Sequence, residues 1–246
     1  MKVLFGCLMG VIAVVVVIIL VAGYFGLMPV VSSLFGSDKP KDLGVTYTQA
    51  DFQSAHTKSG IQRADLPAST PPAQSLVYSG QHAVNLNLTQ QEITALLNLT
   101  PWEYWPYREV QVRFNPDGSA ELSGIVEMDK MKDYALARGL SQSDIGVVMD
   151  KVNTFAVIQK DMPFYLKGTG SVVNGVVTFQ ADKLELGRVS IPTDQVNGRE
   201  AELTRALQEA IARIPGFTCK NFSVSNGQIH FDGTVPNLVK RAVGGG

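Results

Sequence analysis

The sequence predicts an α+β domain, in which a curved antiparallel sheet of β-hairpins packs on helices, preceded by an N-terminal transmembrane helix. Three observations predict it: a long apolar N-terminal segment, helices alternating with strands, and two stretches with the same glycine spacing. These stretches are FNPDGSAELSGIV, with Gly118 and Gly124, and VSNGQIHFDGTVP, with Gly227 and Gly233. In each, an apolar strand leads to a turn ending in glycine, then to an alternating strand that contains a second glycine.

The N-terminal segment has no charged residue from Val3 to Ser37. A helix that spans a bilayer needs roughly 20 apolar residues, so we predict a transmembrane signal anchor over residues 1–35. A cleaved signal peptide is the alternative, because small residues precede Tyr24, but its apolar region usually has only about 7 to 15 residues. Lys2 favours a cytoplasmic N-terminus, with the main domain extracytoplasmic and attached to the plasma membrane by a single pass.

The segment over residues 36–75 is polar and contains a cluster of Pro, Ser and Thr, a composition typical of a stalk. Thr48 and Asp51 have the spacing of a helix capping box and predict a short helix within it. Two interpretations follow for this helix: a small docking element, or part of a partly ordered stalk.

The folded domain is predicted over residues 76–243, which is long enough to bury its own core. A helix from Gln90 carries an apolar stripe and ends before Pro101, and a second helix is expected over residues 199–213. Each helix is followed by a hairpin, and another hairpin that turns at Gly175 lies between the two units. We expect both helices to pack on one face of the sheet.

The glycines divide into two groups. Gly118, Gly175 and Gly227 follow Asp or Asn and predict hairpin turns. Gly124 and Gly233 lie inside strands, where glycine usually marks a bulge, a bend or a close approach. Their matching positions predict a shared structural bend that curls the sheet, and a shared ligand contact is the alternative.

The chemistry that the sequence allows is narrow. A net charge of −1 gives no reason to expect nucleic acid. No residue pattern indicates a metal site, a nucleophile elbow, a phosphate loop or a dinucleotide fingerprint, so no metal, cofactor or catalytic residue is predicted and the chain is not expected to be an enzyme. His230 and Asp232 share a strand face and are the only pair to suggest a hydrolase, although an exposed polar face explains them more simply.

The loop PWEYWPYREV contains both tryptophans of the chain. Its aromatic side chains, Trp102, Tyr104, Trp105 and Tyr107, have polar atoms that suit a ligand rim or a protein interface. The alternative is that they close one end of the core.

The order of anchor, stalk, LTQQEITALLN, the hairpin VRFNPDGSAELSGIV and the terminal IHFDGTVP resembles bacterial membrane-anchored envelope proteins of the YpmS-like and LmeA-like groups, which are related to tubular lipid-binding folds. The resemblance implies a curved sheet around helices with an apolar groove for an acyl chain. The leading hypothesis is therefore an anchored protein that binds a lipid or another amphiphile. The alternatives are a scaffold that docks an envelope protein partner and, third, a lipid hydrolase that uses His230 and Asp232.

Overall fold

The computed structural model describes residues 39–143, 145, 161–186, 189–193, 197, 204–205, 208–209 and 211–244. The predicted anchor and most of the predicted helix over residues 199–213 lie outside this set. Within it, no helix combines the length and the apolar character that crossing a bilayer requires.

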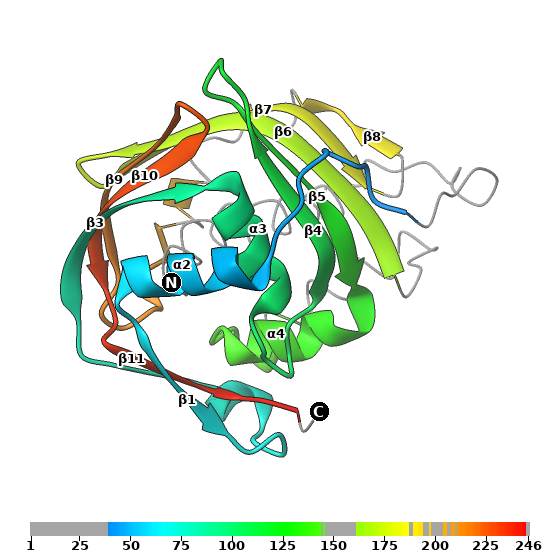
Figure 1. Ribbon diagram of the computed structural model, residues 1–246. Coiled ribbons are helices and arrows are strands. Elements are labelled where there is room, and N and C mark those ends of the chain that lie inside the picture. Colours follow the sequence, from blue (N-terminus) through cyan, green and yellow to red (C-terminus); the bar gives the residue numbers. More distant parts are fainter. Residues whose placement is uncertain are drawn as a thin grey trace.

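The main sheet is antiparallel and curls around the centre of the molecule (Figure 1). Its strands follow the spatial order β3, β10, β9, β6, β5 and β4, and β7 and β8 extend it from the other edge of β6. The bounds are β3 (His82–Thr89), β4 (Tyr107–Phe114), β5 (Ala120–Glu127), β6 (Asp161–Val173), β7 (Val176–Leu186), β8 (Val189–Ile191), β9 (Thr218–Ser225) and β10 (Gln228–Val235). The structure thus confirms an α+β fold with a curled antiparallel sheet.

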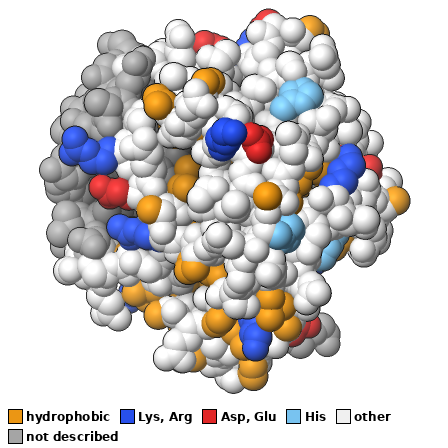
Figure 2. All heavy atoms as spheres, turned by 90° about the vertical axis from the view of Figure 1, so that its left-hand side faces the viewer, with side chains coloured by type: hydrophobic (Ala, Val, Ile, Leu, Met, Phe, Trp, Pro, Cys, Tyr) orange, Lys and Arg blue, Asp and Glu red, His pale blue; other side chains and the backbone are white. Residues whose placement is uncertain are grey.

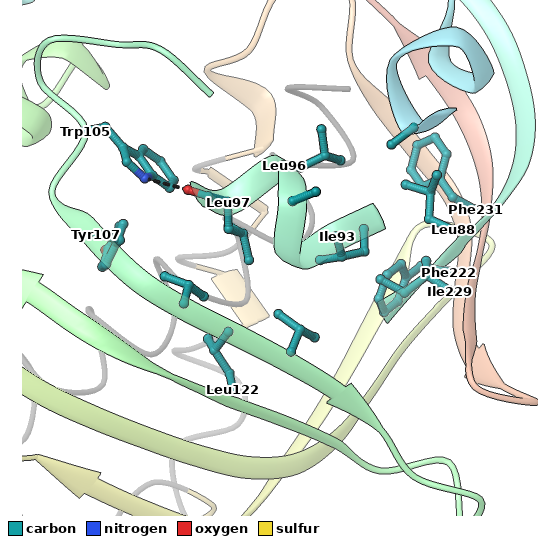
Figure 3. Close-up of a cluster of buried hydrophobic side chains, with 14 of the residues drawn as sticks. Leu88, Ile93, Leu96, Leu97, Trp105, Tyr107, Leu122, Phe222, Ile229 and Phe231 are labelled. Atoms are coloured by element: carbon teal, nitrogen blue, oxygen red, sulfur yellow. Dashed lines mark hydrogen bonds between the residues drawn. The ribbon is translucent and has the colours of Figure 1, made fainter. Parts of the chain in front are cut away.

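Helix α3 (Gln90–Leu99) lies in the concave side of this sheet. Thr89 and Glu92 form its capping box, and Ile93, Leu96 and Leu97 are buried, with exposed fractions of 1%, 1% and 0%. At the other end of the helix, Trp105 Nε1 donates a hydrogen bond to the Leu97 carbonyl at 2.9 Å (Figure 3). The apolar stripe predicted from the sequence is therefore the centre of the core.

Helix α2 (Gln49–Ser59) begins with the predicted capping box of Thr48 and Asp51. It packs against α3, and its Phe52 and Ala55 belong to the main hydrophobic core. This differs from the prediction of a stalk, because the described part of that segment is folded onto the domain. Few apolar residues occur there, but Leu43, Val45, Phe52, Ala55 and Ile61 are buried, which an average over the composition conceals.

A small second sheet joins the two ends of the described chain. Strand β11 (Leu238–Ala242) lies between β1 (Gln62–Leu66), to which it is parallel, and β2 (Leu76–Ser79), to which it is antiparallel. The 3-10 helix η1 (Pro72–Gln74) precedes β2, and the 3-10 helix η2 (Met128–Lys130) and helix α4 (Met131–Ala137) follow β5. Residues predicted as stalk thus pair with the C-terminal strand.

The turn glycines occur as predicted. Gly118, Gly175 and Gly227 have φ angles of 82°, 79° and 72°, in the left-handed region that glycine favours. Both strand glycines lie at register shifts, as predicted. The register of β9 and β10 shifts between Asp232 and Gly233, and that of β4 and β5 shifts between Arg108 and Gln111, opposite Gly124, which pairs continuously with β6 on its other side.

Candidate ligand groove

The main sheet opens along one edge of β6. This strand pairs with β5 as far as Gly168 and with β9 from Val172, so residues 169–171 have no strand partner on that edge in the described chain. The two hairpins β4–β5 and β9–β10 approach β6 from the same side and meet at their ends, where a Cβ built on Gly118 would lie 3.6 Å from the Val224 carbonyl oxygen. The space between the hairpins is the opening.

This opening is a groove with a volume of about 440 Å³. Among the residues that the structure describes, its lining contains small, apolar and uncharged hydrogen-bonding residues and no charged residue: Gly118, Thr169, Gly170, Ser171, Val177, Thr178, Phe179, Gln180, Thr204, Ser223 and Val224. Pockets that bind small molecules typically measure about 300 to 1,000 Å³. The groove is thus large enough for an uncharged molecule with both polar and apolar parts.

Two glycines of β6 lie at or next to the groove: Gly170 lines it, and Gly168 precedes the lining residue Thr169. A Cβ on Gly168 would lie 2.3 Å from the Gln180 carbonyl oxygen, so only glycine fits where the pairing of β6 and β7 shifts register. At Gly170 a Cβ would be 3.6 Å from the Thr178 carbonyl oxygen and 3.7 Å from Phe179 Cδ2, which are ordinary contact distances. Glycine is required at position 168 because of the close backbone contact, whereas at position 170 there is room for a side chain above the strand.

The aromatic loop does not line this groove. Trp102, Trp105 and Tyr107 are buried, with exposed fractions of 7%, 7% and 3%, and the half-buried Tyr104 donates its hydroxyl proton to the Thr70 carbonyl at 2.7 Å. Trp102 packs against Tyr134 in a tilted arrangement and Trp105 and Tyr107 pack against it edge-to-face, with ring centroids 5.6, 6.1 and 5.9 Å away. The structure therefore favours the interpretation that these side chains close one end of the core.

Two arginines near this aromatic cluster, the half-buried Arg138 and the buried Arg241, were not indicated by any pattern in the sequence. Arg138 lies 5.4 Å from the Trp102 ring centroid and 5.2 Å from that of Tyr134. Arg241 is 2% exposed and donates to the Pro101 carbonyl at 3.1 Å. Burial and the neighbouring Arg63 lower the pKa of Arg241 to about 9. Both arginines thus pack against the aromatic end of the core.

A buried carboxylate lies on the opposite, convex face of the sheet. Glu121 on β5 is 4% exposed and accepts hydrogen bonds from the Tyr165 hydroxyl at 2.7 Å, Arg113 Nε at 3.1 Å and Asn115 Nδ2 at 3.0 Å. Burial by itself would raise the pKa of Glu121, but these hydrogen bonds and the positive charge of Arg113 outweigh it and lower the pKa to about 2. Glu121 is thus ionised and fully coordinated, which suits a structural role.

His230 and Asp232 lie on the outer face of β10, each with its own partners. His230 Nδ1 is 2.6 Å from Asn87 Oδ1, and Asp232 Oδ2 is 3.1 Å from Asn221 Nδ2. Ser223 stands opposite His230 in the register of β9 and β10, but no hydrogen bond between their side chains occurs among the described contacts. The described residues therefore contain no assembled nucleophile, base and acid at this pair.

Figure 2 looks onto this side of the molecule, where histidine and charged side chains are scattered over a largely uncharged surface. Within the described ranges, no group of three or more His, Cys, Asp or Glu residues could hold a metal ion.

The fold and the groove together define an α+β domain with a curled sheet and an uncharged opening along its longest strand. Comparison of the chain with protein-family models, with curated proteins and with solved structures gives no match. The resemblance to anchored envelope proteins therefore stays a prediction.

Proposed function

We propose that this protein is a membrane-anchored domain that binds an uncharged amphiphile in the groove along β6. The observation that carries the proposal is the groove itself, with its volume of about 440 Å³ and its mixed, uncharged lining. The apolar segment before Ser37 supports the anchor, and the curled sheet agrees with the fold that the resemblance implies.

The lining suits a molecule with two chemical parts. Val177, Phe179 and Val224 offer apolar contact to an alkyl portion, while the hydroxyl groups of Thr169 and Ser171 can hydrogen-bond to a polar head group. An ionised head group would lose hydration without gaining an oppositely charged partner in this lining, which is costly. The groove therefore favours a neutral, hydroxyl-bearing head group over a charged one.

The proposal retains the hypothesis, made from the sequence, of an anchored protein that binds an amphiphile, and it restricts the ligand to an uncharged amphiphile. A wholly apolar groove for an acyl chain was expected, but hydrogen-bonding side chains make up much of this lining. The scaffold alternative expected exposed tryptophans at positions 102 and 105, and both are buried. The domain would be held by its anchor on the extracytoplasmic side of the plasma membrane, in contact with the bilayer that supplies the amphiphile.

Native mass spectrometry of the full-length chain, purified in mild detergent, tests the proposal. Wild type should carry a co-purified neutral lipid. Gly170→Leu should reduce the bound fraction about tenfold, because the new side chain occupies the groove and a Cβ at Gly170 meets no close atom. Val173→Leu is the matched control, since Val173 lies on the same strand, is 58% exposed and is not in the lining.

A wild-type chain without bound lipid, or a Gly170→Leu variant that binds as much lipid as wild type, would contradict amphiphile binding in this groove. Circular dichroism of both variants checks that the fold is retained.

A further inference from the structure

The turn between β6 and β7 determines which backbone groups of β6 face the groove. Val173 and Val176 flank a two-residue turn, and residues in such flanking positions are joined by backbone hydrogen bonds. The N–H and C=O groups then alternate between the two edges of the strand, and the register stays regular back to Gly168. Gly170 therefore directs its N–H and C=O groups away from β7 and toward the groove.

The same reasoning applies to β9. Ser225 and Gln228 flank the two-residue turn to β10, and Val224 is the next residue along β9, so its N–H and C=O groups point away from β10. The contact with the other hairpin agrees with this direction, because a Cβ built on Gly118 would lie 3.6 Å from the Val224 carbonyl oxygen. Val224 thus also directs a backbone donor and a backbone acceptor into the groove.

Gly170 and Val224 are opposite each other in register, but they do not pair. Val172 pairs with Phe222, and two further residues along this antiparallel register bring Gly170 opposite Val224. The pairing ends at Val172, and the described chain places no other strand against this edge of Gly170. Both residues line the groove, so a ligand between them meets two backbone donors and two backbone acceptors. These groups lose water when the ligand binds and need a partner in it.

The side chains around Gly170 lie on two faces of the β6–β7 hairpin. Neighbouring residues of a strand point to opposite faces, and directly paired residues share a face. Phe179 pairs with Gly170, and together with Val177 it packs on the hydrophobic core. Ser171 and Thr178 pair on the other face, where their hydroxyl oxygens are 2.8 Å apart. The backbone groups of Gly170 therefore lie between an apolar face and a hydroxyl-bearing face.

We infer that the groove selects an uncharged amphiphile in which a secondary amide joins the alkyl chain to a hydroxyl-bearing head group. A secondary amide has one donor and one acceptor, so it can accept a hydrogen bond from a backbone N–H of Gly170 or Val224 and donate one to a backbone C=O. An ester has no donor and leaves both carbonyls without a partner from the ligand. The inference rests on the proposed function and names the chemical class of its ligand.

A competition between matched lipids tests the inference. N-palmitoyl ethanolamine and the palmitate monoester of ethylene glycol have the same alkyl chain and the same hydroxyl group, and they differ only in the N–H that replaces the ester oxygen. Native mass spectrometry of the full-length chain, freed of co-purified lipid, should show about tenfold more amide than ester bound from an equal mixture, because an acceptor without a partner weakens binding by about that factor. The N-methyl form of the amide keeps the carbonyl and lacks the donor, so it should bind as weakly as the ester.

Carbonyl-carbon NMR of the full-length chain in detergent, with isotope-labelled glycine and valine, locates the contact. The amide should shift the carbonyl signal of Gly170 or Val224 downfield and the ester should not, because only the amide donates to a carbonyl. Gly170→Ala and Val224→Ile each remove one labelled signal and so identify it. The carbonyl of Val173, which is 58% exposed and outside the lining, is the control signal that should stay unchanged.

Equal binding of the amide and the ester, or of the amide and its N-methyl form, would overturn the inference and leave amphiphile binding in the groove intact. A preference for the amide without a shift at either carbonyl would also overturn it. A chain that binds none of the three lipids contradicts the inference, and the co-purified lipid of the wild type then shows whether the proposed function fails with it.

Discussion

The β4–β5 and β9–β10 hairpins share a glycine spacing but use it differently. The first turns through residues 115–118, with hydrogen bonds from the Asn115 amide to the Ser119 carbonyl at 2.8 Å and from the Gly118 amide to the Asn115 carbonyl at 3.1 Å. The second turns at Asn226 and Gly227 alone, which have φ angles of 51° and 72°. One sequence pattern thus produces a bulged turn in one hairpin and a two-residue turn in the other.

The second glycine of each hairpin differs more strongly. A Cβ on Gly233 would lie 2.1 Å from the backbone oxygen of Thr218, whereas a Cβ on Gly124 would meet Phe164 Cζ and Val110 Cγ2, both at 3.0 Å. Backbone atoms within a sheet cannot move aside without breaking its pairing, while side chains can shift by tenths of an ångström. Glycines at matching positions are thus required for different reasons: a close backbone contact at Gly233 and the packing of core side chains at Gly124.

The largest expected effect is at Gly233. Gly233→Ala should lower the free energy of unfolding by about 3 kcal/mol or more, because the added methyl group collides with the backbone of β9 at the register shift. Urea denaturation of the full-length chain in detergent, followed by far-UV circular dichroism, measures this loss. A loss below about 1 kcal/mol would show that the register shift adapts easily, and the contrast between the hairpins would then disappear.

The next largest effect is expected from substitution of Glu121, the buried carboxylate of the β4–β5 hairpin. Glu121→Gln should lower the free energy of unfolding at pH 7 by about 2 kcal/mol, because the charged acceptor of hydrogen bonds from Arg113, Asn115 and Tyr165 is removed. The pKa of Glu121 is lowered from 4.5 to about 2 on folding, so its stabilisation is present at neutral pH and is lost as the pH falls from about 4.5 to about 2.

The same denaturation experiment at several pH values measures the Glu121 effect, and the variant should show a flatter acid dependence than wild type. Asp232→Asn in the second hairpin is the matched control. The side chain of Asp232 is 37% exposed and lies 3.9 Å from Lys220, so its loss should cost less than about 0.5 kcal/mol. Equal losses in the two variants would argue against a special role for the first hairpin's carboxylate.

Gly124→Ala should have a smaller effect, a loss of about 1 to 2 kcal/mol, because only side chains must give way. Phe164→Leu shortens the side chain that the new methyl group meets, so the double variant Gly124→Ala/Phe164→Leu should recover part of this loss. A double-mutant cycle measures the recovery. Additive losses would contradict the packing explanation.

The smallest effects are expected at the turns. Gly118→Ala and Gly227→Ala should each cost about 1 kcal/mol, since both positions have positive φ and neither Cβ would meet an atom closer than 3.6 Å. Thermal unfolding of the two variants should give similar shifts. Clearly unequal shifts in the unfolding temperature would mean that more than the φ angle makes glycine necessary at one of the turns.

Local chemistry predicted local structure well. The capping boxes at Thr48 and Thr89, the stripe of α3 and the three glycine turns all depend on residues within a few positions of each other. The small sheet depends on contacts between distant residues, such as the Gln62 and Leu238 pair, for which a short polar segment gives no periodic signal. The stalk prediction therefore failed where the chain returns to its own domain.

The candidate site was less predictable than the fold. The groove exists because β6 is long enough to pair with two hairpins in turn, and its lining of small and hydroxyl residues resembles ordinary strand residues in the sequence. The aromatic loop was the most conspicuous stretch, yet its rings face the core. Composition shows which residues are unusual, but only the register of the strands shows where the sheet opens.

The position of β11 between β1 and β2 also constrains when the molecule can be completed. Strands β1 and β2 emerge from the ribosome well before their shared neighbour, because β2 ends at Ser79 and β11 begins at Leu238. Residues 62–79 must therefore wait, with their backbone groups open to water or to a chaperone, until residues 238–242 arrive. A chain interrupted just before β11 would therefore leave both early strands without their common partner.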